Sequence, residues 1–188
     1  RYLDEMVVWT RRVVPEARLE SSPLVFVGHG IVAPEYGWND YAGVDMRGKT
    51  ALILVNDPGY ATGDEALFRG RAMTYHGRWT YKYEEAARQG AAAAILIHDT
   101  GPAAYDWEVV RSGWSGPQLY PESADGNAGR SALEGWITHA RARELLALAG
   151  QDLAELSAAA ARRGFRALPL GLRASGSLQN TMRRARSP

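Results

Sequence analysis

The four histidines, His29, His76, His98 and His139, are the side chains with the widest chemical scope in this sequence. The chain has no cysteine, which excludes thiolate metal ligands, cysteine nucleophiles and disulfides. No two histidines stand four residues apart, the spacing that points two imidazoles from one helical face toward a metal. The histidines therefore form no local metal-binding motif, and we predict neither catalytic residues nor a metal site in this chain.

A serine nucleophile would have to be Ser115 or a serine assembled by the fold. Ser115 lies in GWSGP, where Pro117 replaces the last glycine of the G-x-S-x-G nucleophile elbow. A Ser-His-Asp site would need a histidine and an acid from distant parts of the chain. Such a freestanding hydrolase is our alternative hypothesis, and it predicts a deep pocket with a perturbed histidine, for example His98 or His76.

The segment 28–33, GHGIVA, matches the G-x-G-x-x-A pattern of dinucleotide-binding loops and follows an apolar run. That fingerprint needs a helix directly afterwards, whose N-terminus holds the pyrophosphate. Pro34 and Gly37 disfavour such a helix, so we interpret the glycines as a turn at the end of a strand. Asp57 and Asp64 could offer oxygen ligands to calcium, but the EF-hand pattern is absent and both suit turns.

Aromatic and cationic residues cluster between positions 75 and 82, where the sequence predicts a helix entrance. Arginine can bind a carboxylate through two hydrogen bonds, and exposed Tyr, Trp and Arg are frequent interface anchors. The predicted substrate- or interface-binding residues are Tyr75, Arg78, Trp79, Tyr81 and Lys82. The alternative is that Trp79 and Tyr83 are core residues and the charges are solvated. Trp107 and Trp114 could likewise cover a cleft, dock on another domain or pack in the core.

The elements that must position these residues alternate between strand and helix patterns. Thr80 is a suitable N-cap for a helix that Gly90 ends, and an apolar run at 93–97 predicts a buried strand. Further strands are predicted at 24–27, 50–55, 133–137 and 168–178, and further helices at 138–149 and 152–163. Thr138 and Asp152 are the expected N-caps of those two helices. This order predicts a mixed α/β fold.

Composition limits the possible partners of the chain. It has 188 residues, enough for one compact domain with a real core. The net charge is +1, so no strong positive field predicts nucleic-acid binding. No apolar run reaches the roughly 20 residues that a membrane helix needs. We therefore expect neither a nucleic-acid partner nor a membrane.

Long ordered strings in the chain resemble the protease-associated (PA) domain. The helix-to-strand passage EEAARQGAAAAILIHD, the segment LVFVGHGIVAPEYGWNDYAGVDMRGKTALILVNDPGY and the segment WEVVRSGWSGPQ carry the likeness. More narrowly, they resemble the PA domain inserted in zinc aminopeptidases of the glutamate carboxypeptidase and transferrin-receptor superfamily. The resemblance is close over 23–118 and looser elsewhere.

The resemblance implies a small β-sandwich or open barrel flanked by helices. It implies a lead-in segment at 1–22, the PA domain at 23–178, and a basic tail at 179–188 leading to a catalytic domain outside this chain. The superfamily's two-zinc site uses an H-x-D element, and none of the four histidines begins one. The resemblance thus places the zinc in the parent catalytic domain and no cofactor in this chain.

By the same resemblance, the chain is a noncatalytic cap of a secreted or periplasmic zinc aminopeptidase that hydrolyses peptides from the N-terminus. Its partners would be the parent catalytic domain and the peptide substrate, with the loop before the central helix facing the cleft. Besides the freestanding hydrolase, a stand-alone peptide-binding module is the remaining alternative.

Overall fold

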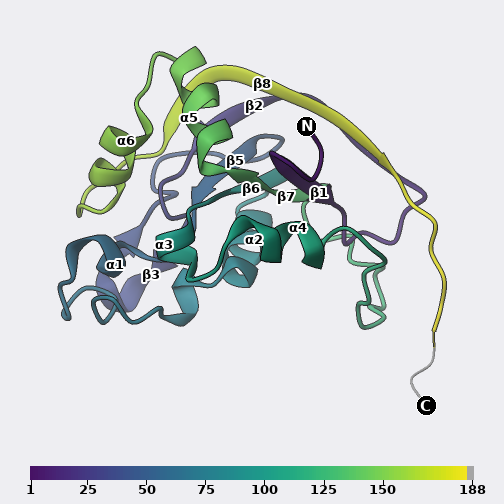
Figure 1. The fold of residues 1–188 in the computed structure, drawn as a ribbon, viewed down its shortest axis with the longest axis horizontal. Coiled ribbons are helices and arrows are strands. Elements are labelled where there is room, and N and C mark those ends of the chain that lie inside the picture. Colours follow the sequence, from purple (N-terminus) through teal and green to yellow (C-terminus); the bar gives the residue numbers. More distant parts are fainter. Residues whose placement is uncertain (186–188) are drawn as a thin grey trace.

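The computed structural model of the chain describes residues 1–185, so the last three residues of the predicted basic tail lie outside the described part. Strands and helices alternate along most of the chain (Figure 1). The elements are β1 (Met6–Trp9), β2 (Glu16–Phe26), β3 (Val32–Ala33), η1 (Pro34–Tyr36), β4 (Trp38–Asn39), β5 (Thr50–Leu54), α1 (Pro58–Thr62), η2 (Tyr75–Gly77), α2 (Trp79–Arg88), β6 (Ala93–His98), α3 (Thr100–Ala103), α4 (Trp107–Gly113), β7 (Leu133–Thr138), α5 (His139–Leu148), α6 (Leu153–Ala160) and β8 (Leu168–Gln179).

The main sheet has six strands in the order β1-β7-β6-β5-β2-β8. Its four central strands are β2, β5, β6 and β7. They run parallel, and each is joined to the next by a crossover connection, with the short strands β3 and β4 lying in the connection from β2 to β5. Parallel neighbours need such connections because a tight hairpin can join only antiparallel strands. The outer strands β1 and β8 are antiparallel to their neighbours, and the sheet is curled (Figure 1). The predicted mixed α/β class is confirmed.

Helices cover both faces of the sheet, because successive side chains of a strand point to opposite faces. Val25, Ile53 and Leu96 pack with α2 on one face. Their neighbours Phe26, Leu52 and Ile97 pack with α5 and α6 on the other. The strands are therefore buried on both sides, as the uninterrupted apolar run at 93–97 predicts.

The predicted caps of the two later helices are confirmed, and the predicted cap of α2 is wrong. The side chain of Thr138 accepts a hydrogen bond from the amide of Arg141, and that of Asp152 accepts one from Glu155. Helix α2 begins at Trp79 and not after Thr80, and its N-cap Arg78 provides no side-chain cap. The preceding turn η2 ends at Gly77, and Arg78 is both the C-cap of this turn and the N-cap of α2.

The segment 1–22 contributes to the sheet. Strand β1 pairs with β7 over four residue pairs, from Met6 with Ile137 to Trp9 with Glu134. The first half of β2 pairs with the end of β8, where Glu16 lies opposite Gln179. The stretch expected as a lead-in therefore supplies an edge strand and part of a central strand.

The glycines of the GHGIVA segment form a turn and not a dinucleotide loop. Gly28 and Gly30 both have positive φ, and the amide of Gly30 donates to the carbonyl of Val27. The chain then enters the short ribbon β3-β4, with the single turn η1 between the two strands. No α-helix follows the glycines, as Pro34 and Gly37 predict. Within residues 1–185, no helix has the length and apolar character needed to cross a bilayer.

Candidate functional site

The entrance of helix α2 presents two exposed side chains from the predicted set. Tyr75 lies in η2 with 58% of its surface exposed, and Arg78 is exposed directly before the helix. The Tyr75 hydroxyl donates to Glu84 Oε2 at 3.2 Å, which ties the loop to the second turn of the helix. Met73, which is also exposed, precedes them. This surface therefore combines a tyrosine, an arginine and a methionine on one short stretch.

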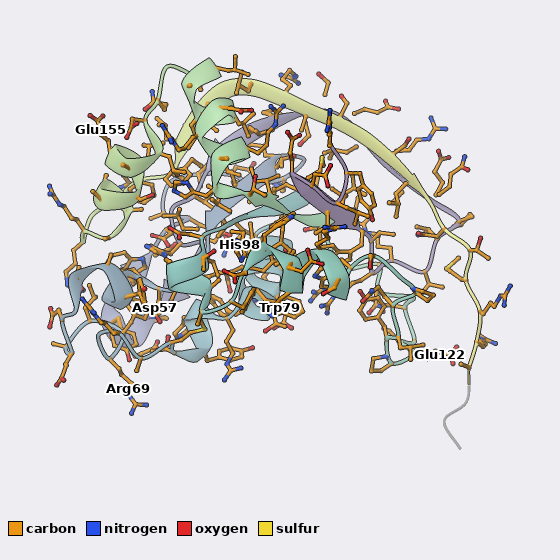
Figure 2. The ribbon with its side chains drawn as sticks, in the orientation of Figure 1. Asp57, Arg69, Trp79, His98, Glu122 and Glu155 are labelled. Carbon is orange, nitrogen blue, oxygen red and sulfur yellow. The ribbon has the colours of Figure 1, made fainter. Side chains whose placement is uncertain are left out.

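Trp79, labelled in Figure 2, is half-buried. Its ring belongs to an aromatic cluster. The Trp79 and Trp114 rings meet edge-on, with 5.7 Å between their centroids. The Trp114 ring also stacks on the Trp9 ring, with 3.6 Å between centroids. The Arg11 guanidinium lies 5.8 Å from the centre of the Trp79 ring. Trp79 therefore packs largely against its own chain, and its partner Tyr83 is fully buried in the core.

Trp107 and Trp114 both contact the N-terminal segment. Trp107 donates from Nε1 to the carbonyl of Leu3 at 2.9 Å, and Trp114 stacks on Trp9 of β1. Both rings are partly buried against the same core cluster. Their contacts are therefore with this chain.

Tyr81 is 3% exposed and fixes α2 to the β3-β4 ribbon. Its hydroxyl donates to the carbonyl of Val32 at 3.0 Å and accepts from the amide of Val32 at 3.1 Å. Burial raises the pKa of Tyr81 to about 12, so the phenol stays protonated at neutral pH. Tyr81 thus positions the helix and does not face solvent.

Lys82 is fully buried beneath the entrance. Its Nζ donates to the main-chain carbonyl of His29 at 2.6 Å. Burial lowers the pKa of Lys82, and the negative charges of Asp40 and Asp57 oppose that shift. Asp40 is buried as well, and burial raises its pKa against hydrogen bonds from the amide of Ile31 and the indole of Trp38. This internal charge group ties α2 to the strand ends.

His76 links the loop to η1 through a partly exposed contact. Its Nε2 lies 2.8 Å from Glu35 Oε1, and this hydrogen bond lowers the pKa of Glu35. The imidazole also meets the rings of Phe68 and Tyr81 edge-on. His76 therefore braces the loop that carries Tyr75.

The groups needed for covalent chemistry are not brought together at this entrance. The Ser115 hydroxyl donates to the carbonyl of Ser112, and the Nε2 of His98 contacts the carbonyl of Tyr105 at 3.0 Å. Burial lowers the pKa of His98. Within residues 1–185 no serine hydroxyl is hydrogen-bonded to a histidine, and no group of three or more His, Asp or Glu residues could hold a metal ion. The entrance can act through noncovalent contacts.

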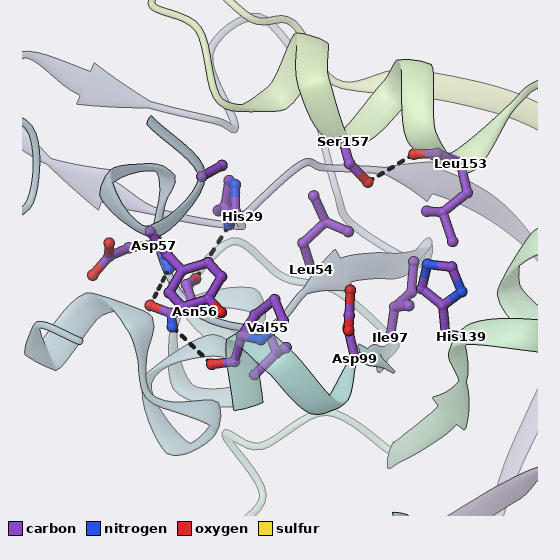
Figure 3. A pocket seen from close by; sticks show the side chains of 13 residues that line it. His29, Leu54, Val55, Asn56, Asp57, Ile97, Asp99, His139, Leu153 and Ser157 are labelled. Atoms are coloured by element: carbon purple, nitrogen blue, oxygen red, sulfur yellow. Dashed lines mark hydrogen bonds between the residues drawn. The ribbon is translucent and has the colours of Figure 1, made fainter. Parts of the chain in front are cut away.

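Sequence reasoning missed a second feature, a cavity beside the ends of the parallel strands. His29, Asn56 and Asp57 contribute to it (Figure 3). His29 belongs to the GHGIVA segment, whose pattern suggests only a dinucleotide-binding loop. The available signal was the recurrence of polar residues directly after successive apolar strands.

The comparison with known protein families and the comparison with curated proteins each found no match. Among solved structures, the chain is similar to an aminopeptidase from Aneurinibacillus sp. strain AM-1, with a TM-score of 0.39 and 23% sequence identity. The match covers 79% of this chain and 26% of that protein, so the chain spans about a quarter of its length.

Proposed function

We propose that this chain is a noncatalytic PA-like cap that controls substrate access and binds peptide in a zinc aminopeptidase. The long ordered strings over 23–118 support the proposal, and so does the mixed α/β framework that presents the entrance of α2. In this proposal the zinc belongs to the parent catalytic domain. Secretion or periplasmic localisation and hydrolysis from the peptide N-terminus are parts of the same proposal.

The observation that carries the proposal is the contrast between the exposed and buried members of the predicted set. Tyr75 and Arg78 face solvent, whereas Tyr81 and Lys82 are held inside by hydrogen bonds. Among residues 1–185 the Arg78 guanidinium has no ion-pair or hydrogen-bond partner, so it is available to an acidic group of a peptide. The Tyr75 hydroxyl is already held to α2 by Glu84, which reduces the entropy that Tyr75 loses on binding.

The decisive test compares Arg78→Ala and Tyr75→Ala in the whole protein that carries this chain. A charge-assisted hydrogen bond made equally to substrate and transition state should raise KM by about tenfold when Arg78 is removed, with kcat unchanged. Arg71→Ala, an exposed arginine in the same loop, is the matched control and should change KM less than about twofold. Unchanged KM in both test variants would refute the role of this surface.

A second assay tests the noncatalytic part of the proposal. The isolated chain, supplemented with zinc, is mixed with aminoacyl-anilides and ester substrates, and turnover is measured with and without chelator. We expect no hydrolysis. Chelator-sensitive aminopeptidase turnover would overturn the cap assignment, and chelator-resistant ester turnover would favour a hydrolytic serine.

A further inference from the structure

Strand β8 forms one edge of the main sheet, and its second half has no protection against pairing with another strand. Its first half carries three features that discourage such pairing: Pro169, the break in register around Gly171 and the charge of Arg173. The segment 174–179, ASGSLQ, has no proline and no charged residue. In Figure 1 this part of β8 follows the outer rim of the sheet beside β2 alone. Natural sheets protect or cover their edges, so this segment calls for a pairing partner.

The main-chain groups of alternate residues in this segment point away from β2. The amide of Asn180 donates to the carbonyl of Pro15 at 2.9 Å, in register with the pairing of β8 and β2. In an antiparallel pair, residues that bond to the neighbouring strand alternate with residues that do not. Even-numbered residues therefore bond to β2, whereas Ser175, Ser177 and Gln179 direct their amides and carbonyls outward. Within residues 1–185 these outward groups bond to no other segment.

The side chains of the segment divide between two faces of the sheet. The even-numbered side chains face the core, since Ala174 and Leu178 pack against a buried cluster that includes Leu133. Leu178 is only half-buried, so part of its apolar surface still contacts water. The odd-numbered side chains are exposed, polar and uncharged. A strand added at this edge must therefore be small or apolar on one face and uncharged on the other, and the segment itself has this pattern.

We propose that β8 pairs with β8 of a second copy of this chain, antiparallel about a two-fold axis at Ser177. Each Ser177 then lies opposite its copy, and each Ser175 lies opposite Gln179 of the other copy, so every outward main-chain group of the segment is bonded. Leu178 lies across from Gly176 of the other copy, where the missing side chain leaves room for it. The proposal does not depend on the cap function, because it can be tested on this chain alone.

The neighbouring registers are less favourable for a two-fold pair. An axis at Ser175 would bring the irregular Gly171 opposite Gln179 of the other copy. An axis at Gln179 would carry the pairing beyond the end of β8. A contact of this length buries less area than a typical stable dimer, so we expect a weak dimer that forms at high protein concentration.

Sedimentation velocity of the chain over a range of concentrations tests the proposal, and we expect a monomer–dimer equilibrium. Ser177→Pro removes an outward amide that the fold does not use, and proline is tolerated on an edge strand at such a position. The two-fold symmetry removes two hydrogen bonds at once, so dimer affinity should fall by at least about tenfold with an unchanged circular dichroism spectrum. Ser177→Ala keeps the amide and is the matched control, which should dimerise like wild type.

Ser177→Lys is a second test that leaves the main chain intact. Two like charges then face each other across the axis, so the dimer should weaken, and added salt should partly restore it. Ser115→Lys, at an exposed serine outside the strand, is the control for added charge. A chain that stays monomeric up to millimolar concentration would overturn the proposal. Dimers that persist in both Ser177→Pro and Ser177→Lys would also overturn it, because the interface would then lie elsewhere.

Discussion

The carboxylate of Asp57 accepts two hydrogen bonds at one oxygen from Thr74. The amide of Thr74 donates to Oδ2 at 3.0 Å, and its hydroxyl donates to the same oxygen at 2.8 Å. Asp57 follows β5 and is fully buried, whereas Thr74 directly precedes the exposed Tyr75. This contact therefore anchors the loop at the entrance of α2 to the end of the central sheet.

Replacing Thr74 by valine should destabilise the fold, because a buried carboxylate oxygen loses one of its two donors. We expect the free energy of unfolding in urea to fall by about 1–3 kcal/mol. Thr74→Ser keeps the hydroxyl and is the matched control, with a loss of less than about 1 kcal/mol expected. Equal stability of the valine variant and wild type would show that the hydroxyl contact is not formed in solution.

The buried neutral ring of His29 predicts that stability falls as the pH is lowered. Its folded pKa of about 3 lies below the usual 6.5, so between these values the unfolded chain binds more protons than the folded one. The contribution of His29 to the free energy of unfolding therefore rises with pH through this window. At pH 5 the loss from His29 relative to pH 7.5 should be about 2 kcal/mol. Burial lowers the pKa of His98 too, which adds a slope of the same sign.

Urea unfolding of wild type, His29→Gln and His139→Gln at pH 7.5 and pH 5 checks this dependence. The His29→Gln variant should show a smaller loss between the two pH values than wild type, whatever its stability at pH 7.5. The exposed His139 is the control, and its replacement should leave the pH dependence close to that of wild type. A slope that is identical in all three proteins would contradict the buried neutral state of His29.

Two tyrosines near α2 should respond differently to loss of the hydroxyl. The Tyr83 hydroxyl is fully buried and donates to the carbonyl of Gly135 at 2.8 Å. Tyr83→Phe leaves that buried carbonyl without this donor and should cost about 1–3 kcal/mol in thermal or urea unfolding. Tyr75→Phe removes an exposed hydroxyl and should change stability by less than about 0.5 kcal/mol. Similar losses in both variants would refute the burial contrast.

A substitution at Gly135 tests whether β1 is part of the sheet. A Cβ at this position would lie 2.5 Å from the main-chain oxygen of Val7 and 3.2 Å from a methyl carbon of Val8. Gly135→Ala should therefore displace β1 and destabilise the chain by more than about 2 kcal/mol. At Gly113 the same change meets no atom within 4 Å and should be neutral or mildly stabilising. If Gly135→Ala left the stability of the chain unchanged, β1 could not pack against β7 as described.

Elements with strong local signals could be predicted from the sequence. The apolar run at 93–97 corresponds to β6, and Thr138 and Asp152 cap α5 and α6 as expected. Thr80 failed as a cap because α2 begins at Trp79, two residues earlier than a Thr80 cap requires, directly after η2 and Arg78. Local patterns record what a residue prefers and not what the neighbouring turn imposes.

Features that depend on distant contacts could not be predicted in this way. The pairing of β1 with β7 joins residues separated by most of the chain, and no period in the sequence encodes it. The burial of Tyr81 and Lys82 likewise depends on Val32 and His29, which come from other elements. At the candidate site, residue types at 75–82 indicated aromatic and cationic chemistry, but only the fold separates the exposed side chains from the buried ones.

Strand β8 gives the sheet a particular order of assembly. It pairs along most of β2, so residues 16–26 cannot complete this pairing until residues 168–179 have been synthesised. Closing such a long loop is entropically slow compared with local contacts, and it cannot occur on the ribosome before most of the chain has emerged. Until then one side of β2 is an open template for another strand. The nascent chain should therefore be most vulnerable to aggregation, and most dependent on chaperones, just before β8 is synthesised.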